Sequence, residues 1–190
     1  MARPRSEDKR NAILAAAAQV IAEQGIGAPT ARIARLAGVA EGTLFTYFDT
    51  KDELLNQLYL EIKAELREAM MATYPKAASL QNRARHVWEK YVYWGVAQPA
   101  KRRAMAQLAV SDRISEHARV AGMHAFANVN AMIEESIAKG ALRDLPPAFV
   151  SAIMGSLAET TMDFISRDPA QAERYRNAGF EAFWHAIAQV

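Results

Sequence analysis

Apolar residues recur at three- and four-residue spacing along most of the chain, and no segment alternates apolar and polar positions over the length of a strand. Residues typical of helix ends divide this pattern. Ser6 stands before the first helix, Gly25 follows it, and Pro99 and Pro147 open later ones. The helices of the second part are expected at roughly residues 79–98, 100–110, 115–139, 147–166 and 169–189. The pattern therefore predicts an all-α protein.

The stretch from Thr30 to Lys51 is typical of two short helices joined by a turn. Gly38 is expected to end the first helix, because glycine readily adopts the left-handed conformation that closes a helix. In the second helix Leu44 and Phe48 lie four residues apart and are expected to face inward. The opposite side carries little charge and consists of Glu41, Gly42, Thr43, Phe45, Thr46 and Tyr47. Small, hydroxyl and aromatic groups on one helix face favour insertion into a DNA groove.

A long helix is predicted to begin directly after this pair. Thr50 and Glu53 form a capping box, in which the threonine hydroxyl accepts from the Glu53 amide and the glutamate reaches back. Apolar residues continue at helical spacing toward Thr73, and Pro75 stops the pattern. We therefore expect a three-helix helix-turn-helix head in residues 1–50, joined by this connector helix to a helical body in residues 51–190.

The segment GVAEGTLFTYFDTKDELL resembles the signature G-V-S-x-G-T-L-Y-x-Y-F-x-S-K-E-E-L-L of the tetracycline-repressor (TetR) family of bacterial transcriptional regulators. The resemblance covers Ile13 to Leu55. It implies a homodimeric repressor whose body binds a small molecule and forms the dimer, and whose connector helix shifts when the ligand binds. It also implies that double-stranded DNA is contacted, with Tyr47 and Lys51 on phosphates, by Thr30, Ala31, Glu41, Gly42, Thr43, Phe45, Thr46, Tyr47 and Lys51.

Three residues depart from the family signature. Ala40 stands where a serine cap is usual, Glu41 where a basic or amide side chain is common, and Phe45 where a tyrosine hydroxyl often reaches DNA. Glu41 could accept a hydrogen bond from a cytosine amino group, or it could repel phosphate and lower non-specific affinity. Thr43 is expected on the DNA, on either a base or a phosphate. These departures affect the expected base preference and leave the motif intact.

The last two helices are apolar on more than one face. One face would serve the core, and the other would serve a dimer contact of two helices from each chain, which is also where the resemblance places it. The expected interface residues are Ala152, Gly155, Met162, Gly179 and Phe183. The alternative is that both faces are buried within one chain. A two-fold dimer would present two DNA-recognition helices, one from each chain, about 34–36 Å apart and would favour a near-palindromic operator.

Aromatic and methionine residues are frequent in the middle helices and could line a cavity for a small apolar or aromatic ligand. The expected lining residues are Trp88, Tyr91, Met105, Met123, His124 and Phe126. The alternative is that they simply form core, since stripes of this kind usually do. A body without such a cavity would indicate a helical interaction protein or an architectural DNA-binding protein that has no inducer.

Catalytic and metal-binding patterns are weak throughout the sequence. The chain contains no cysteine, which excludes disulfides and thiol nucleophiles. His117 and His124 are seven residues apart, too far along a helix to share a metal comfortably. Ser111, Asp112 and His117 supply triad residue types without a nucleophile elbow, and no glycine-rich phosphate loop is present. We expect no enzyme activity, catalytic residue, metal or cofactor.

Charge and hydropathy add a weak preference for DNA and argue against a membrane. The net charge of +2 arises within residues 1–51, which hold seven Lys/Arg and five Asp/Glu and leave 16 of each sign after them. A basic start can reach phosphates, although basic tails are common. The apolar run at residues 147–166 is interrupted by Glu159 and Asp163, and the first ten residues lack the apolar core of a signal peptide. We therefore expect a cytoplasmic protein.

Overall fold

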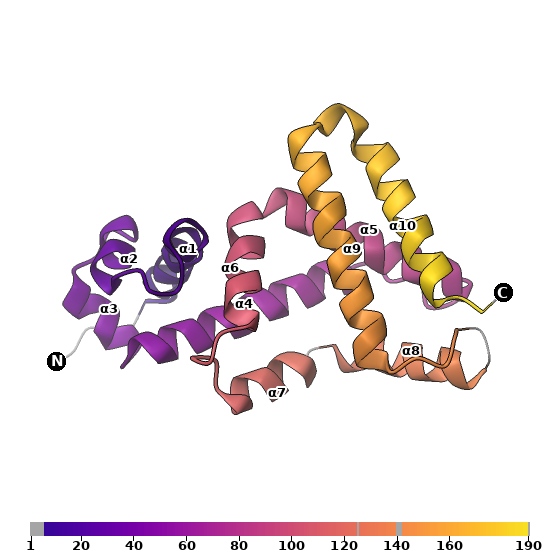
Figure 1. Ribbon diagram of the computed structural model, residues 1–190. Helices are drawn as coiled ribbons and strands as arrows, with labels where there is room; N and C mark the ends of the chain where they lie inside the picture. The colour runs from indigo at the N-terminus through magenta and orange to yellow at the C-terminus, as the bar shows by residue number, and fades with distance from the viewer. Residues whose placement is uncertain (1–5, 125, 140–141, 190) are drawn as a thin grey trace. The chain divides into compact units, whose positions relative to one another are not determined.

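The computed structural model describes residues 6–124, 126–139 and 142–189, which form helices joined by short loops (Figure 1). These are α1 (Glu7–Gln24), α2 (Thr30–Leu36), α3 (Glu41–Tyr47), α4 (Lys51–Met71), α5 (Leu80–Ala97), α6 (Pro99–Ala109), α7 (Glu116–His124), α8 (Ala127–Ala138), α9 (Pro147–Arg167), the 3₁₀ turn η1 (Pro169–Gln171) and α10 (Ala172–Ile187). An isolated bridge between Leu142 and Ala188 is the sole β-type pairing in these ranges. The predicted all-α fold class is confirmed. Among the described helices, none has the length and apolarity that a bilayer crossing requires.

The helices pack into two compact units. Unit 1 comprises the residues up to Ala64 together with Gln98–Met123, and unit 2 comprises Glu65–Ala97 and the residues from His124 onward. The connector helix α4 therefore contributes to both units. The boundary expected between residues 50 and 51 does not coincide with this division, because α6 and α7 pack with the helices of the head.

Unit 1 is centred on α1, which packs against α2 and α6. Ile13 and Ile21 of α1 are fully buried, and the small alanines between them allow neighbouring helices to approach closely. The Gln107 side chain of α6 donates from Nε2 to the Ile21 carbonyl oxygen at 3.1 Å. The same oxygen accepts the Gly25 N–H that caps α1 at 2.9 Å, so the Gln107 side chain uses its second lone pair and ties α6 to the end of α1. α6 therefore completes the head, although it lies far from the head in sequence.

The single helix predicted over residues 115–139 is wrong, because the structure has two helices there, α7 and α8. Ala118 and Gly122 of α7 are buried in unit 1, whereas Ile133 of α8 belongs to the core of unit 2. The two halves of the segment thus bury their apolar residues in different cores. No proline occurs between residues 115 and 139 to mark the change.

Unit 2 is built around Trp88 of α5 and the aromatic residues of α10. The Trp88 ring stacks on Phe183 with centroids 5.9 Å apart, and its Nε1–H donates to the Arg176 carbonyl oxygen at 3.0 Å. Gly179 permits the close approach of α10. A Cβ at this position would lie 2.3 Å from Thr161 Oγ1 of α9 and 2.7 Å from Trp88 Cζ2.

The dimer prediction for α9 and α10 needs a correction. Met162 and Phe183 are only 0% and 3% exposed and belong to the core of unit 2, and Gly179 faces Trp88 and Thr161. These three residues, which we predicted in the dimer interface, lie in the core instead, because the helix faces that carry them pack against α5 within the same chain. Ala152 is exposed and Gly155 is partly exposed, so these two are the members of the predicted interface set that a partner chain could still contact.

Candidate nucleic-acid interface

The helices α2 and α3 are held together by their buried sides. Ile33 of α2 and Leu44 of α3 are fully buried. Between the helices Gly38 has a φ of +69°, a conformation that glycine adopts without a steric penalty. The Val39 N–H donates to the Ala34 carbonyl oxygen at 3.0 Å and closes the turn. The predicted helix-turn-helix is therefore confirmed.

The outer side of α3 faces solvent, together with part of α2. The exposed members of the predicted DNA-facing set are Ala31, Glu41, Gly42, Phe45 and Thr46. The partly buried members are Thr30, Thr43, Tyr47 and Lys51. Nothing lies within 4 Å of the position that a Cβ on Gly42 would occupy. The structure thus brings the predicted residues to one accessible region of unit 1.

Glu41 carries the single formal charge within α3, and its carboxylate is tied to α2. Glu41 Oε1 accepts a hydrogen bond from Thr30 Oγ1 at 2.6 Å. The bond joins the first residues of the two helices and orients the carboxylate. A carboxylate has about four acceptor positions, so Glu41 can still accept from a donor on DNA.

Tyr47 and Lys51, the two expected phosphate contacts, each have a partner inside unit 1. The Tyr47 hydroxyl accepts from the Ser6 backbone N–H at 2.9 Å, and Lys51 Nζ donates to the Ala28 carbonyl oxygen at 2.7 Å. Burial and then the charge of Arg113 lower the pKa of Lys51, while Asp52 opposes them. The Tyr47 O–H is not used by the first bond, and the Lys51 amine has further N–H groups beyond the second, so both residues have donors left for a phosphate.

The start of α4 is fixed by the predicted capping box, with one difference. The Glu53 N–H donates to Thr50 Oγ1 at 3.0 Å, as expected. The Glu53 carboxylate, however, accepts from the N–H of Asp49 at 2.7 Å, one residue earlier than in a standard box. The two bonds fix the turn between α3 and α4 and therefore the position of Lys51.

The loop between α6 and α7 contacts α4 beside this turn, a connection that sequence reasoning missed. The Arg113 guanidinium lies 3.3 Å from Asp52, and the Arg113 carbonyl oxygen accepts from Asn56 Nδ2 at 3.0 Å. Asn56 Oδ1 also accepts from the Ser115 N–H at 2.9 Å. These partners lie about sixty residues apart in sequence, and no local pattern predicts their contact.

The residues expected to line a ligand cavity are not gathered in one compact unit. Trp88 is fully buried in the core of unit 2, and Tyr91 packs against that core. Met105 and Met123 belong to unit 1, where Met123 is 58% exposed. The two remaining members of the set are His124, which is exposed, and Phe126, which is partly buried. Trp88 is therefore a packing residue, in line with the core alternative.

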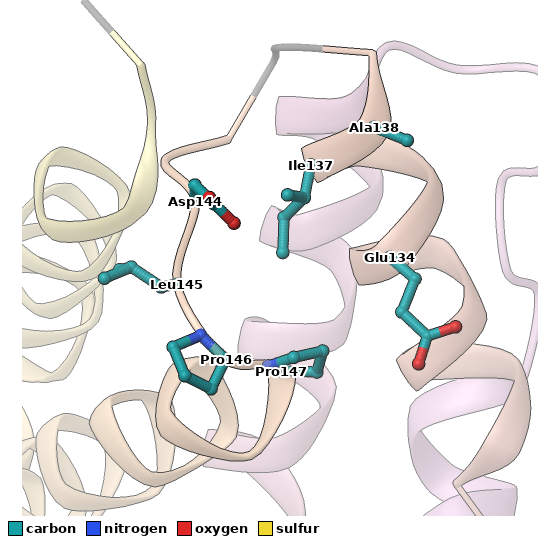
Figure 2. A pocket seen from close by; sticks show the side chains of 7 residues that line it. All are labelled: Glu134, Ile137, Ala138, Asp144, Leu145, Pro146 and Pro147. Atoms are coloured by element: carbon teal, nitrogen blue, oxygen red, sulfur yellow. The ribbon is translucent and has the colours of Figure 1, made fainter.

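A surface pocket of about 540 Å³ lies elsewhere in unit 2, between α8 and the segment leading to α9 (Figure 2). It is lined by Glu134, Ile137, Ala138, Asp144, Leu145, Pro146 and Pro147. None of these residues was expected to line a cavity. The sequence gives little indication that these residues line a pocket, because the pocket wall combines one face of a helix with a proline-containing loop.

Comparisons with known proteins agree with this geometry. Residues 13–58 match the family described as "Bacterial regulatory proteins, tetR family". A stretch of 80 residues is 34% identical to the fatty acid metabolism regulator protein of Bacillus subtilis and spans 42% of this chain but only 41% of that protein.

Solved structures extend the similarity to almost the whole chain. A protein described as a tetR-family transcription regulator from Shewanella sp. PV-4 is 30% identical with a TM-score of 0.86, covering 98% of this chain and 100% of that one. A TetR-family transcription regulator from Marinobacter aquaeolei VT8 also has a TM-score of 0.86, with 97% of each chain covered. At 18% identity this second similarity concerns the fold alone.

Proposed function

The chain belongs to the tetR family of bacterial regulatory proteins, and we propose that within this family it is a small-molecule-responsive repressor that binds a near-palindromic operator as a homodimer. Members of the family are DNA-binding transcription regulators and not enzymes, in agreement with the weak catalytic patterns of the sequence. A regulator of this kind acts where the chromosome is, so we place it in the cytoplasm.

The observation that carries the DNA contact is the two-sided character of α3. Leu44 is fully buried, while Gly42, Phe45 and Thr46 on the other side are exposed. A short helix that is anchored on one side and nearly uncharged on the other fits a major groove, where hydroxyl and apolar groups meet base edges. Tyr47 would then lie on the phosphate backbone beside the groove.

Replacing Lys51 with alanine tests the phosphate contact. The variant should bind operator and random DNA more weakly, and the slope of log K against log salt should fall by about one, because one phosphate contact is lost. Fluorescence anisotropy over a salt series measures both quantities. Lys139→Ala is the matched control, since Lys139 is an exposed lysine on unit 2. An unchanged slope in Lys51→Ala would exclude the phosphate contact.

Glu41→Gln separates the two roles open to the carboxylate. If Glu41 accepts from a cytosine amino group, the variant should lose about 1–3 kcal/mol of discrimination at one base position. If the carboxylate repels phosphate, the variant should bind all sequences more tightly and no base preference should change. Selection of bound fragments from random DNA with both proteins distinguishes these outcomes.

The remaining apolar surface of α9 supports the proposed dimer. Phe149 is 55% exposed, Ala152 is exposed, and Gly155 offers open space for a partner helix. A two-fold contact through this side would pair two heads and allow them to occupy successive major grooves about 34–36 Å apart.

Response to a small molecule is tested by repeating the DNA selection in the presence of candidate ligands. Release of the operator by one of them would support the proposed regulator. A ligand changes operator affinity only if it binds the two arrangements of the heads with different affinity. Operator binding that no ligand changes would favour the rival function, an architectural DNA-binding protein without an inducer.

A further inference from the structure

A cluster of polar side chains gathers in unit 2 where the turn after α4 meets α5 and α8. It consists of Tyr74 from the turn, Arg83 and His86 from the first half of α5, and Met132 from α8. The Tyr74 and His86 rings meet edge to face, with centroids 5.9 Å apart. The Tyr74 hydroxyl donates to the Met132 sulfur at 2.7 Å. The cluster lies outside the proposed DNA interface and outside the pocket of Figure 2.

The hydrogen-bonding capacity of this cluster is poorly used. Arg83 Nε and His86 Nε2 are buried without a hydrogen-bond partner among the described residues. The phenol of Tyr74 donates to a thioether, which is a weak acceptor. Buried polar groups are normally satisfied, so each orphaned nitrogen calls for a hydrogen-bond partner, and the Arg83 Nε–H requires an acceptor.

The backbone before Tyr74 is also unusual. Thr73 has a φ of +54°, a left-handed conformation that is costly for a β-branched residue. This conformation turns the chain directly after α4 and precedes the residue whose ring meets His86. Strained backbone positions persist where the surrounding structure fixes them, often at ligand sites.

The charges at the cluster define the ligand it would accept. Arg83 supplies one positive charge, and the imidazole and phenol can each add an N–H or O–H donor. Burial raises the pKa of Tyr74, while the charge of Arg83 and a hydrogen bond from Arg83 act in the opposite direction. Burial is the larger effect, so the phenol keeps its proton near neutral pH. The Glu135 carboxylate lies close enough to interact electrostatically with Arg83, although it also pairs with Lys139. One guanidinium beside a carboxylate suits a single negative charge and disfavours a dianion.

We propose that Tyr74, Arg83 and His86 form a binding site for the carboxylate of a small organic acid. The carboxylate oxygens would accept from Arg83 Nε–H, from His86 Nε2–H and from the Tyr74 hydroxyl, which would leave the Met132 sulfur. All three residues are partly exposed, so the cluster lies at the surface of unit 2 and not deep in its core. This inference rests on the proposed function, because it names the ligand class that the body of the regulator would take.

Titration of the full chain with sodium benzoate and sodium octanoate at constant ionic strength tests the site. We expect a saturable shift of the His86 imidazole NMR signals, identified by their loss in His86→Gln, without similar shifts of the other three histidines. Sodium phenyl phosphate, a dianion near neutral pH, should bind at least about ten-fold more weakly. A shift that does not saturate, or equal binding of phenyl phosphate, would overturn the proposal.

Two conservative variants connect binding to the cluster. Arg83→Gln should lower benzoate affinity by about ten-fold or more, and Tyr74→Phe, which removes only the hydroxyl, by about three- to ten-fold. The controls are Arg174→Gln, at an exposed arginine on α10, and Tyr93→Phe, at a tyrosine that is 53% exposed on α5. Unchanged affinity in both cluster variants would contradict the assigned residues.

Operator binding measured in the same samples separates this proposal from the proposed function. Carboxylate binding that leaves operator affinity unchanged supports the site and contradicts a carboxylate-responsive repressor. Operator release by a neutral molecule, with no His86 shift by either acid, overturns the site and supports the regulator.

Discussion

Single residues decide how closely the helices of each unit can pack. At Gly179 a side chain would collide with Thr161 and Trp88, at Gly122 a Cβ would lie 2.7 Å from the Tyr59 ring, and at Gly155 and Gly42 it would meet nothing within 4 Å. The same residue type therefore serves close packing at two positions and leaves an open helix surface at the other two. Substitution by alanine distinguishes these roles.

Gly179→Ala should destabilise the chain by about 1–3 kcal/mol, because the new methyl group overpacks the contact between α9 and α10. Gly42→Ala is the matched control and should be neutral or stabilising by up to about 1 kcal/mol, since nothing lies within 4 Å of its Cβ position and alanine favours a helix. Urea denaturation followed by circular dichroism measures both. Equal stability of the two variants would contradict the packing described for Gly179.

Gly42→Ala should separate stability from DNA binding. The free chain has space for the methyl group and α3 gains helix propensity of up to about 1 kcal/mol, so the unfolding midpoint should stay level or rise. Operator affinity should fall, because the methyl group adds bulk to the surface proposed to approach the groove. Retained affinity would argue that α3 does not enter the groove at Gly42.

Lys63 of α4 gives a stability difference that depends on pH. Burial lowers its pKa below that of a free lysine, so the folded state disfavours the charged form. Its contribution to stability is therefore fully present above the unfolded pKa of about 10.4 and is lost as pH falls through the lower folded pKa. Wild-type protein should gain stability relative to Lys63→Met as pH is raised from 7 toward 10. A difference that stays constant across this range would contradict the burial of the ammonium group.

At the scale of elements, the turn between α3 and α4 determines where the proposed DNA contacts lie. Thr50 and Glu53 each form one hydrogen bond to the backbone at the start of α4, and Lys51 stands between them. The helix start and the candidate phosphate contact are thus a single structural feature. The loop carrying Arg113 contacts the same turn of α4.

Thr50→Ala should cost about 1 kcal/mol of stability, as loss of an N-cap side chain commonly does. Operator affinity should also fall, because Lys51 is no longer held in one position. Thr160→Ala on α9 is the control, since the hydroxyl of this exposed threonine donates to the Ser156 carbonyl oxygen of its own helix. Thermal unfolding with parallel anisotropy titrations gives both values. Equal unfolding midpoints for the two variants would count against the cap.

At the scale of the whole molecule, the function we propose requires two copies of the chain. Gly155→Glu should convert the proposed dimer to monomer, because the new carboxylate would be buried against the same residue of the partner helix. The monomer itself has room for a side chain there. Sedimentation equilibrium measures the change, and Ala131→Glu, at an exposed position of α8, is the control. A dimer that survives Gly155→Glu would exclude this side of α9 as the interface.

Features that depend on neighbouring residues could be predicted from the sequence alone. Helical periodicity gave the all-α class, Gly38 gave the turn of the helix-turn-helix, and Thr50 with Glu53 gave the start of α4. These three predictions are correct because backbone conformation and local hydrogen bonds are set within one or two turns of the chain.

Which of several apolar stripes is buried, and which distant segments meet, followed from the packing of the folded chain and not from its local sequence. Helical periodicity is compatible with either an interface or a core position for Phe183 and Met162. The close approach of α10 to α9 and Trp88 buries both residues in the core. The division of residues 115–139 between two cores and the meeting of Tyr74 with His86 likewise depend on long-range packing. Burial is a property of what the rest of the chain places against a surface, and no local pattern encodes it.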